Sequence, residues 1–235
     1  MIDKLVKLRE IKLTCEDIKA MNYQYVDMNH YKRKSHFDYF CGLSYPYVGL
    51  TVNVDITKFV AAIKKEKCPF FLSFLYCIAK AANSVPEFRQ RIIDGKIAEY
   101  NSCKTSHTVA LEDGTYCYCT LSFDMSFQDY LPYAVQMQED SKTVKSTEDH
   151  DDKHELIFIS TLPWLSYTAL INPVPTPADS NPRITWGKYF KQGSEIWIPV
   201  SVLCNHALVD GLHISQFYHF LNRYINELTN TMDTF

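Results

Sequence analysis

The side chain best suited to chemistry in this sequence is a histidine that ends an apolar stretch. Residues 195–204 lead directly into Asn205 and His206, and Asp210 and Gly211 follow before a helical pattern begins. A histidine at a strand end can face a cleft instead of the core. Because an unperturbed imidazole has a pKa of about 6.5, it can remove a hydroxyl proton near neutral pH. His206 is therefore the candidate general base.

The same pattern also has a purely structural interpretation. In isolation, His-x-x-x-Asp-Gly favours a histidine packed in a turn and a helix-capping carboxylate at Asp210. Gly211 would permit the sharp reversal into the helix, and Asp210 would need a cationic partner if it is buried. The rest of the chain decides between the two interpretations.

Further segments occur in an order that supports the catalytic interpretation. They are residues 31–40, 51–57, 86–89, 94–95, 160–164, 187–189 and 206–211. In these blocks the chain resembles the chloramphenicol acetyltransferase family from residue 33 to about residue 228. Several blocks in one order are far more specific than a single motif. Ser35 replaces the family's usual glutamate, and Asn205 stands where many relatives have a second histidine; neither change removes a chemical role.

The resemblance implies transfer of an acetyl group from acetyl-coenzyme A to a hydroxyl of chloramphenicol, in a ternary complex without a covalent acyl-enzyme. It implies that His206 deprotonates the hydroxyl and that Ser160 donates a hydrogen bond to the tetrahedral oxyanion. Asp210 would pair with Arg33 and so hold the turn that carries the histidine.

Three more residues receive roles from the resemblance. Thr185 would hold a water near the intermediate, Trp164 would contact coenzyme A, and Phe40 stands where some members have a tyrosine that binds the antibiotic. The resemblance also implies a homotrimer with its active sites between subunits. Two alternatives stay open: another acceptor, such as a dihydrolipoyl thiol, and a catalytically silent trimeric binding protein.

Hydrophobic periodicity predicts the elements that position these residues. Alternation in residues 50–56 predicts a strand that buries Leu50, Val52, Val54 and Ile56, and Thr57 is expected to cap a helix over residues 57–65. Further helices are expected over residues 69–82 and 127–144 and after residue 211, and a hairpin is expected at residues 94–95. Further strands are expected over residues 96–100, 108–111, 115–122, 156–160, 183–190 and 195–204. The proline-rich crossing over residues 173–182 is expected to be irregular. The fold class is an α/β two-layer sandwich with a mixed, mainly antiparallel sheet flanked by helices, as in coenzyme A-dependent acyltransferases.

Composition limits the organisation and the partners of the chain. We expect residues 1–30 to be an N-terminal arm, with one weak helix around residues 15–21, and residues 31–235 to be a single acetyltransferase domain. The net charge is −3 and the 24 basic residues are scattered, so nucleic acid is not an expected partner. No apolar run is long enough to cross a bilayer, no leading signal segment is present, and the eight cysteines form no Cys-x-x-Cys pair. We therefore expect a cytoplasmic protein with no membrane partner. The two histidines of residues 150–155 are interpreted as part of a solvated acidic turn, so no metal is expected.

Overall fold

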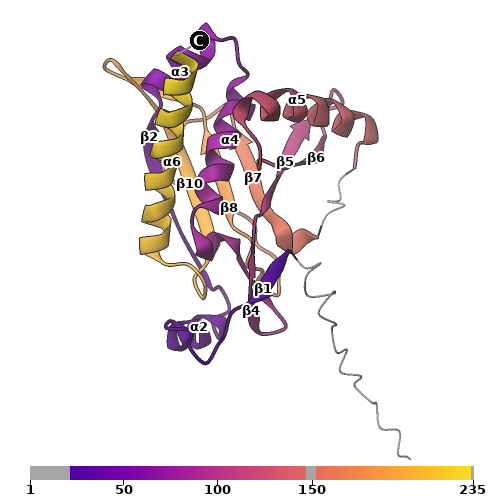
Figure 1. The fold of residues 1–235 in the computed structure, drawn as a ribbon, viewed down its shortest axis with the longest axis vertical. Helices are drawn as coiled ribbons and strands as arrows, with labels where there is room; N and C mark the ends of the chain where they lie inside the picture. The colour runs from indigo at the N-terminus through magenta and orange to yellow at the C-terminus, as the bar shows by residue number, and fades with distance from the viewer. Residues whose placement is uncertain (1–21, 147–151, 234–235) are drawn as a thin grey trace, which may run out of the picture.

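A mixed sheet whose strands come from most of the chain forms the centre of the molecule (Figure 1). The computed structural model describes residues 22–146 and 152–233, so the helix predicted around residues 15–21 lies outside the described residues. The strand order is β2 (Tyr47–Asp55), β10 (Glu195–Asn205), β8 (Arg183–Gly187), β7 (Leu156–Leu162), β5 (Lys104–Ala110) and β6 (Tyr116–Leu121), and β9 (Phe190–Gln192) pairs with β10. Among the described strands, the parallel pairs are β5 with β7 and β7 with β8, and the other pairs are antiparallel. The predicted mixed, mainly antiparallel sheet is confirmed.

Helices cover one face of this sheet, which gives the predicted two layers (Figure 1). They are α3 (Thr57–Lys65), α4 (Phe70–Asn83), α5 (Phe127–Val144) and α6 (Gly211–Asp233). The apolar spacing in α4 buries Phe74, Leu75 and Ile78 completely. Helix α3 has the predicted bounds, but its cap is different. Asp55 Oδ1 accepts the N–H of Thr57 at 2.9 Å, so Asp55 satisfies the first turn, and the prediction of Thr57 as the cap is wrong.

The predicted buried face of β2 is only half right. Val54 and Ile56 are buried, whereas Leu50 is 41% exposed and Val52 37% exposed. The periodicity correctly predicts a strand, but β2 is an edge strand of the large sheet. Apolar side chains there are left partly uncovered, and period-two alternation alone does not distinguish an edge strand from a central one.

Smaller elements lie at one end of the sheet. The hairpin predicted at Asp94 and Gly95 is confirmed: both residues have positive φ angles, 49° and 73°, between strands β3 (Gln90–Ile93) and β4 (Lys96–Tyr100). Four short elements were not predicted: β1 (Tyr23–Tyr25), which pairs with β4, α2 (Lys34–Cys41), η1 (Pro86–Arg89) and η2 (Lys153–Glu155). The chain from residue 163 to residue 182 has no regular structure, as its prolines predict, and the strand predicted over residues 183–190 divides into β8 and β9.

The sheet face away from the helices carries a row of hydroxyl groups. Thr51 pairs with Ser201, Ser201 with Thr185, and Thr185 with Ser160, so four adjacent strands each contribute one hydroxyl at the same level. Side chains alternate between the two faces of a strand. The residues next to these hydroxyls, such as Val200, Ile184 and Ile159, point instead into the helix-covered core. One face therefore builds the core and the other is available for chemistry.

A search of the described residues for a membrane-spanning helix gave none: every helix there is too short or too polar to cross a bilayer.

A buried histidine, His107, lies in the helix-covered layer. His107 on β5 is 2% exposed, its ring centroid lies 4.9 Å from that of Phe71, and its Nε2 lies 2.9 Å from Nε2 of Gln138 on α5. The amide of Gln138 donates this bond, which leaves the ring proton on Nδ1, a buried atom with no partner in the described chain. Burial lowers the pKa of His107 to about 4, so the ring is neutral in the folded protein near pH 7.

This histidine makes stability depend on pH. Between pH 6.5 and about 4 the unfolded chain binds a proton at His107 that the folded chain does not. The contribution of the neutral His107 ring to the free energy of unfolding is therefore complete above pH 6.5 and is lost as the pH falls toward 4. Urea unfolding at pH 7.5 and pH 4.5 should show that wild type loses about 2–3 kcal/mol more than His107→Gln, which keeps a partner for Gln138. Exposed His219→Gln is the control. Equal losses in wild type and His107→Gln would contradict the buried neutral ring.

Candidate functional site

The candidate base, His206, sits in the turn directly after β10. Its backbone N–H donates to the carbonyl of Pro46 at 2.7 Å, and its Nδ1 lies 2.8 Å from the carbonyl oxygen of Val209. A carbonyl oxygen only accepts, so Nδ1 carries the proton and Nε2 keeps its lone pair. This tautomer is the one that a general base acting through Nε2 requires.

An aromatic ring covers one side of this imidazole. Phe40, on the short helix α2, stacks on His206 with the ring centroids 3.8 Å apart and an angle of 21° between the planes. Such close stacking restricts rotation of the imidazole. The sequence interpretation placed Phe40 at the acceptor, whereas here it lies directly on the candidate base.

The predicted pair of Arg33 and Asp210 is present beneath the turn. Nη2 of Arg33 lies 3.3 Å from Oδ2 of Asp210, and Nη1 donates to the carbonyl of Leu208. The other carboxylate oxygen, Oδ1, accepts the N–H of Leu212 at 2.9 Å and so caps α6. Asp210 therefore joins the histidine turn both to Arg33 and to the start of the last helix.

A second histidine completes the surroundings of Asp210. His213 is 7% exposed; its Nδ1 accepts the backbone N–H of Asp210 at 3.1 Å, and its Nε2 lies 3.5 Å from Glu87. Partial burial by itself raises the pKa of the Asp210 carboxyl, but His213, the Leu212 N–H and Arg33 outweigh it and hold that pKa below its ordinary value. Asp210 is thus ionised well below neutral pH.

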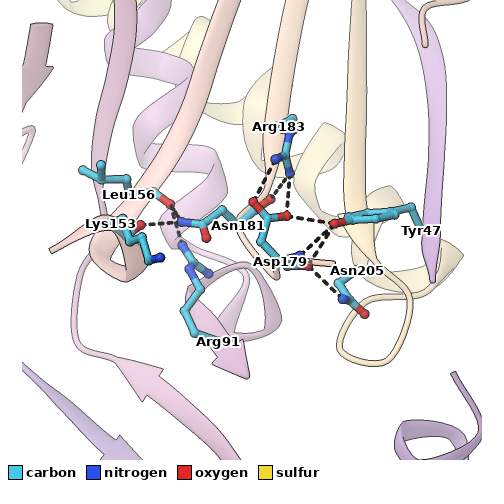
Figure 2. Close-up of polar contacts among 8 residues, drawn as sticks. All are labelled: Tyr47, Arg91, Lys153, Leu156, Asp179, Asn181, Arg183 and Asn205. Atoms are coloured by element: carbon cyan, nitrogen blue, oxygen red, sulfur yellow. Dashed lines mark hydrogen bonds and ion pairs between the residues drawn. The ribbon is translucent and has the colours of Figure 1, made fainter. Parts of the chain in front are cut away.

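A contact that sequence reasoning missed holds the other end of the turn (Figure 2). Oδ1 of Asn205 accepts the N–H of Ala207 at 3.0 Å, while Nδ2 of Asn205 donates to the carbonyl of Asp179 at 2.9 Å. The hydroxyl of Tyr47 accepts the N–H of Asp179 at 2.9 Å and lies 2.9 Å from its carboxylate. No sequence signal marks Asp179, because it lies in the irregular proline-rich crossing.

Ser160 and Thr185 lie on the hydroxyl-bearing face of the sheet, side by side on β7 and β8. Both line a cavity of about 420 Å³. Trp164, four residues beyond Ser160, is on the surface with 77% of its area exposed. The other residues lining the cavity are Ser106, His107, Thr108, Tyr118, Phe158, Ile159, Asn172, Pro173 and Arg183.

The histidine turn and the pair Ser160–Thr185 do not meet within one chain. Ser160 and Thr185 are level with Ser201, and His206 lies five residues beyond Ser201, just past the end of β10. At about 3.3 Å per residue and about 4.8 Å between strands, the Cα atoms of His206 and Ser160 are roughly 19 Å apart. His206 is not among the residues that line the cavity. The structure thus brings His206, Phe40, Arg33 and Asp210 together, and separately Ser160 and Thr185.

The described residues contain no group of three or more His, Cys, Asp or Glu side chains that could hold a metal ion. Part of the acidic turn considered from the sequence, including His150 and Asp151, lies outside the described residues.

Comparison with known proteins identifies the family. Residues 21–228 match the family described as chloramphenicol acetyltransferase. The chain belongs to this family. It is accordingly an acyltransferase with the fold of the coenzyme A-dependent acyltransferases.

Individual relatives agree with this assignment. Proteins named chloramphenicol acetyltransferase from Klebsiella sp. and Escherichia coli are each 28% identical over 213 residues, covering 89% of this chain and 96% of theirs. A solved chloramphenicol acetyltransferase superimposes with a TM-score of 0.76 at 22% identity, over 86% of this chain and 99% of that one. The dihydrolipoamide acetyltransferase of Azotobacter vinelandii has a TM-score of 0.60 at 18% identity, covering 83% of this chain and 86% of that one, and shares the fold.

The pair of Arg33 and Asp210 should contribute modestly to stability. The Asp210 side chain is 37% exposed, so Asp210→Asn, which keeps an oxygen to cap α6, should lower the free energy of unfolding at pH 7 by about 0.5–1 kcal/mol. Asp210→Ala also removes the cap and should cost about 1 kcal/mol more. Because the folded-state pKa is lowered, the contribution of the charge is present above about pH 3.9 and is lost as the pH falls through the lower folded value.

Urea unfolding of wild type, both variants and the double variant Arg33→Met/Asp210→Asn measures these differences and the coupling between the two side chains. Wild type and Asp210→Asn should become equally stable in acid. A difference that persists at pH 2 would show that the charge is not its cause, and a loss of more than about 3 kcal/mol at pH 7 would contradict the exposed geometry.

Proposed function

We propose that this acyltransferase moves the acetyl group of acetyl-coenzyme A to a hydroxyl of chloramphenicol, with His206 as the general base. The observation that carries the proposal is the bond from Nδ1 of His206 to the Val209 carbonyl, which leaves the unprotonated Nε2 for the substrate. Phe40 stacks on the imidazole of His206, and Arg33 pairs with Asp210 in the same turn. Both contacts support an imidazole held in one orientation, which proton transfer requires.

In the proposed reaction, Nε2 of His206 takes the hydroxyl proton while the hydroxyl oxygen attacks the thioester carbonyl carbon. The carbonyl oxygen becomes an oxyanion, which accepts a hydrogen bond from Oγ of Ser160, and Thr185 holds a water beside it. When the intermediate collapses, the carbon–sulfur bond breaks and the thiolate of coenzyme A receives the proton from the imidazolium. No covalent acyl-enzyme is needed, because His206 activates the acceptor itself.

The separation of His206 from Ser160 within one chain supports a site shared between subunits. We propose a homotrimer in which His206 of one protomer faces the cavity of its neighbour, with Ser160 and Thr185 in that cavity. Exposed apolar side chains support an extensive interface; they include Tyr39, Leu43, Leu50, Trp164, Leu165 and Ile171. Trp164, in the loop after β7, would contact coenzyme A, and Phe40 would border the acceptor next to His206.

A thiol-release assay with acetyl-coenzyme A distinguishes this function from the alternatives. Release with chloramphenicol supports the proposed reaction. We propose with it a role in antibiotic resistance and a location in the cytoplasm. Release only with dihydrolipoamide or another acceptor would indicate a different acyltransferase. Tight binding of chloramphenicol without release would indicate a silent binding protein.

His206→Ala should lower kcat with chloramphenicol by about 10²–10⁴-fold, since it removes the general base and not a core residue. Light scattering should give the same oligomeric mass as wild type. His219→Ala, which removes an exposed histidine of α6, is the matched control and should keep full activity. A His206→Ala protein that dissociates would show that the residue is structural.

Mixing two inactive variants tests the shared site directly. Ser160→Ala should lose about 10²–10³-fold in kcat through the missing oxyanion donor. If His206 and Ser160 come from different protomers, reassembling His206→Ala with Ser160→Ala at equal amounts makes about one quarter of the sites intact. Activity should then return to about a quarter of wild type. No recovery, with mixed oligomers verified by mass, would place both residues in the same protomer.

A further inference from the structure

The cavity beside Ser160 is lined by Arg183, which belongs to a partly buried ion pair that the proposed chemistry does not use. Among the described residues that line it, Arg183 is the one with a permanent charge. Nη1 of Arg183 lies 2.9 Å from Oδ1 of Asp179, and Nη2 lies 2.8 Å from Oδ2 (Figure 2). The side chains are 12% and 24% exposed, and the guanidinium carbon of Arg183 lies 5.5 Å from the ring centroid of Phe158 on the next strand. Arg183 is therefore held in one orientation.

Its partner is fixed just as firmly. The backbone of Asp179 is bound by Tyr47 and Asn205. Two residues further along, Asn181 is 3% exposed and donates to the carbonyl of Leu156 at 2.8 Å. Figure 2 shows these contacts along one short segment of the chain. The carboxylate that orients Arg183 is thus anchored on both sides, and little ordering is left to be done when a ligand binds.

Arg183 keeps unused donors. A guanidinium has five N–H groups. Nη1 uses both of its own, toward Asp179 and toward the carbonyl of Asn181 at 3.2 Å, and Nη2 uses one. Within the described part of the chain, the Nε–H and the second N–H of Nη2 have no partner. These two lie on the same edge of the guanidinium and point in parallel, which is the geometry that binds a planar oxygen group.

The position on the sheet relates this edge to the reaction. Arg183 and Thr185 are two residues apart on β8 and point to the same face, about 7 Å from each other. Asp179 balances the charge of Arg183, so the pair offers hydrogen bonds without a net positive charge. Resting on the proposed function, we infer that Arg183, oriented by Asp179, is a specificity-determining residue. It donates from Nε and Nη2 to a neutral carbonyl or nitro oxygen of the acceptor and so directs the acceptor hydroxyl toward the thioester carbonyl and His206 of the neighbouring protomer.

Three variants test this role: Arg183→Met, Arg183→Gln, which keeps N–H donors, and Asp179→Asn. Lys191→Met, which removes an exposed cation from β9, is the control. KM and kcat are measured by thiol release with chloramphenicol and with analogues in which hydrogen or a carboxylate replaces the nitro group. Calorimetry without acetyl-coenzyme A gives Kd for the same compounds.

We expect Arg183→Met to raise KM and Kd for chloramphenicol about tenfold, with the KM for acetyl-coenzyme A unchanged. The Tm of this variant should fall, because the Asp179 carboxylate loses its ionic partner. Arg183→Gln should recover part of the lost affinity for chloramphenicol. If Arg183 binds the nitro group, the hydrogen analogue should bind wild type and Arg183→Met with equal Kd. If Arg183 binds the amide carbonyl, the tenfold difference in Kd between the two proteins should persist with the hydrogen analogue. Asp179→Asn leaves the charge of Arg183 unbalanced, so it should favour the carboxylate analogue over chloramphenicol about tenfold relative to wild type.

Equal Kd values for chloramphenicol in wild type and folded Arg183→Met would overturn the inference, even if wild type releases thiol and the proposed function stands. If Arg183→Met does not fold, Asp179→Asn decides: an unchanged preference between chloramphenicol and the carboxylate analogue, relative to wild type, overturns the inference. Absence of thiol release by wild type contradicts the proposed function alone, because the Kd comparison still decides the role of Arg183. A wild type that binds none of the three compounds overturns both.

Discussion

The bond from Nδ1 of His206 to the carbonyl of Val209 is the interaction on which the candidate site depends. It joins a side chain to the backbone three residues away, so it exists only while the turn keeps its shape. It also selects the tautomer, because a proton held on Nδ1 leaves Nε2 as the basic nitrogen. A turn that opened by a few ångströms would release the imidazole and allow either tautomer.

The sheet imposes the second constraint. One face is closed by helices and is apolar, and the other carries the row of hydroxyls of which Ser160 and Thr185 are part. The row crosses the middle of the strands, whereas His206 lies beyond the end of β10. No rotation of side chains spans roughly 19 Å between the two. A chemistry that needs both groups would therefore need a second copy of the chain.

Local sequence patterns were sufficient to predict the helices and strands that carry the site residues. They were insufficient to predict the contacts that hold those residues in position. The bounds of α3 and α5 agree with the prediction because apolar spacing is a property of neighbouring residues. Helix α2 was missed because it has only eight residues, of which four are polar, and only Phe37 is buried. The contact of Tyr47 with Asp179 joins residues 132 apart, and Asp179 lies between prolines without periodicity. The pair of Arg33 and Asp210 came from a family resemblance, since spacing alone gave no reason to join positions so far apart.

A single segment of the chain, residues 33–47, explains how the turn keeps its shape. Arg33 binds the Leu208 carbonyl and Asp210, and Phe40 covers the imidazole. The carbonyl of Pro46 accepts the N–H of His206, and Tyr47 is the first residue to pair with β10, at Asn205.

Asn205, His206, Leu208 and Asp210 are thus contacted by one continuous stretch that includes α2 and enters β2. Helix α2 has only eight residues, too few for an isolated helix to be stable in water, so its position in turn depends on these contacts. The turn and the segment stabilise each other, and neither is expected to keep its conformation without the other. The basic nitrogen is consequently positioned by the local bond to Val209 together with the long-range packing that keeps the turn in shape.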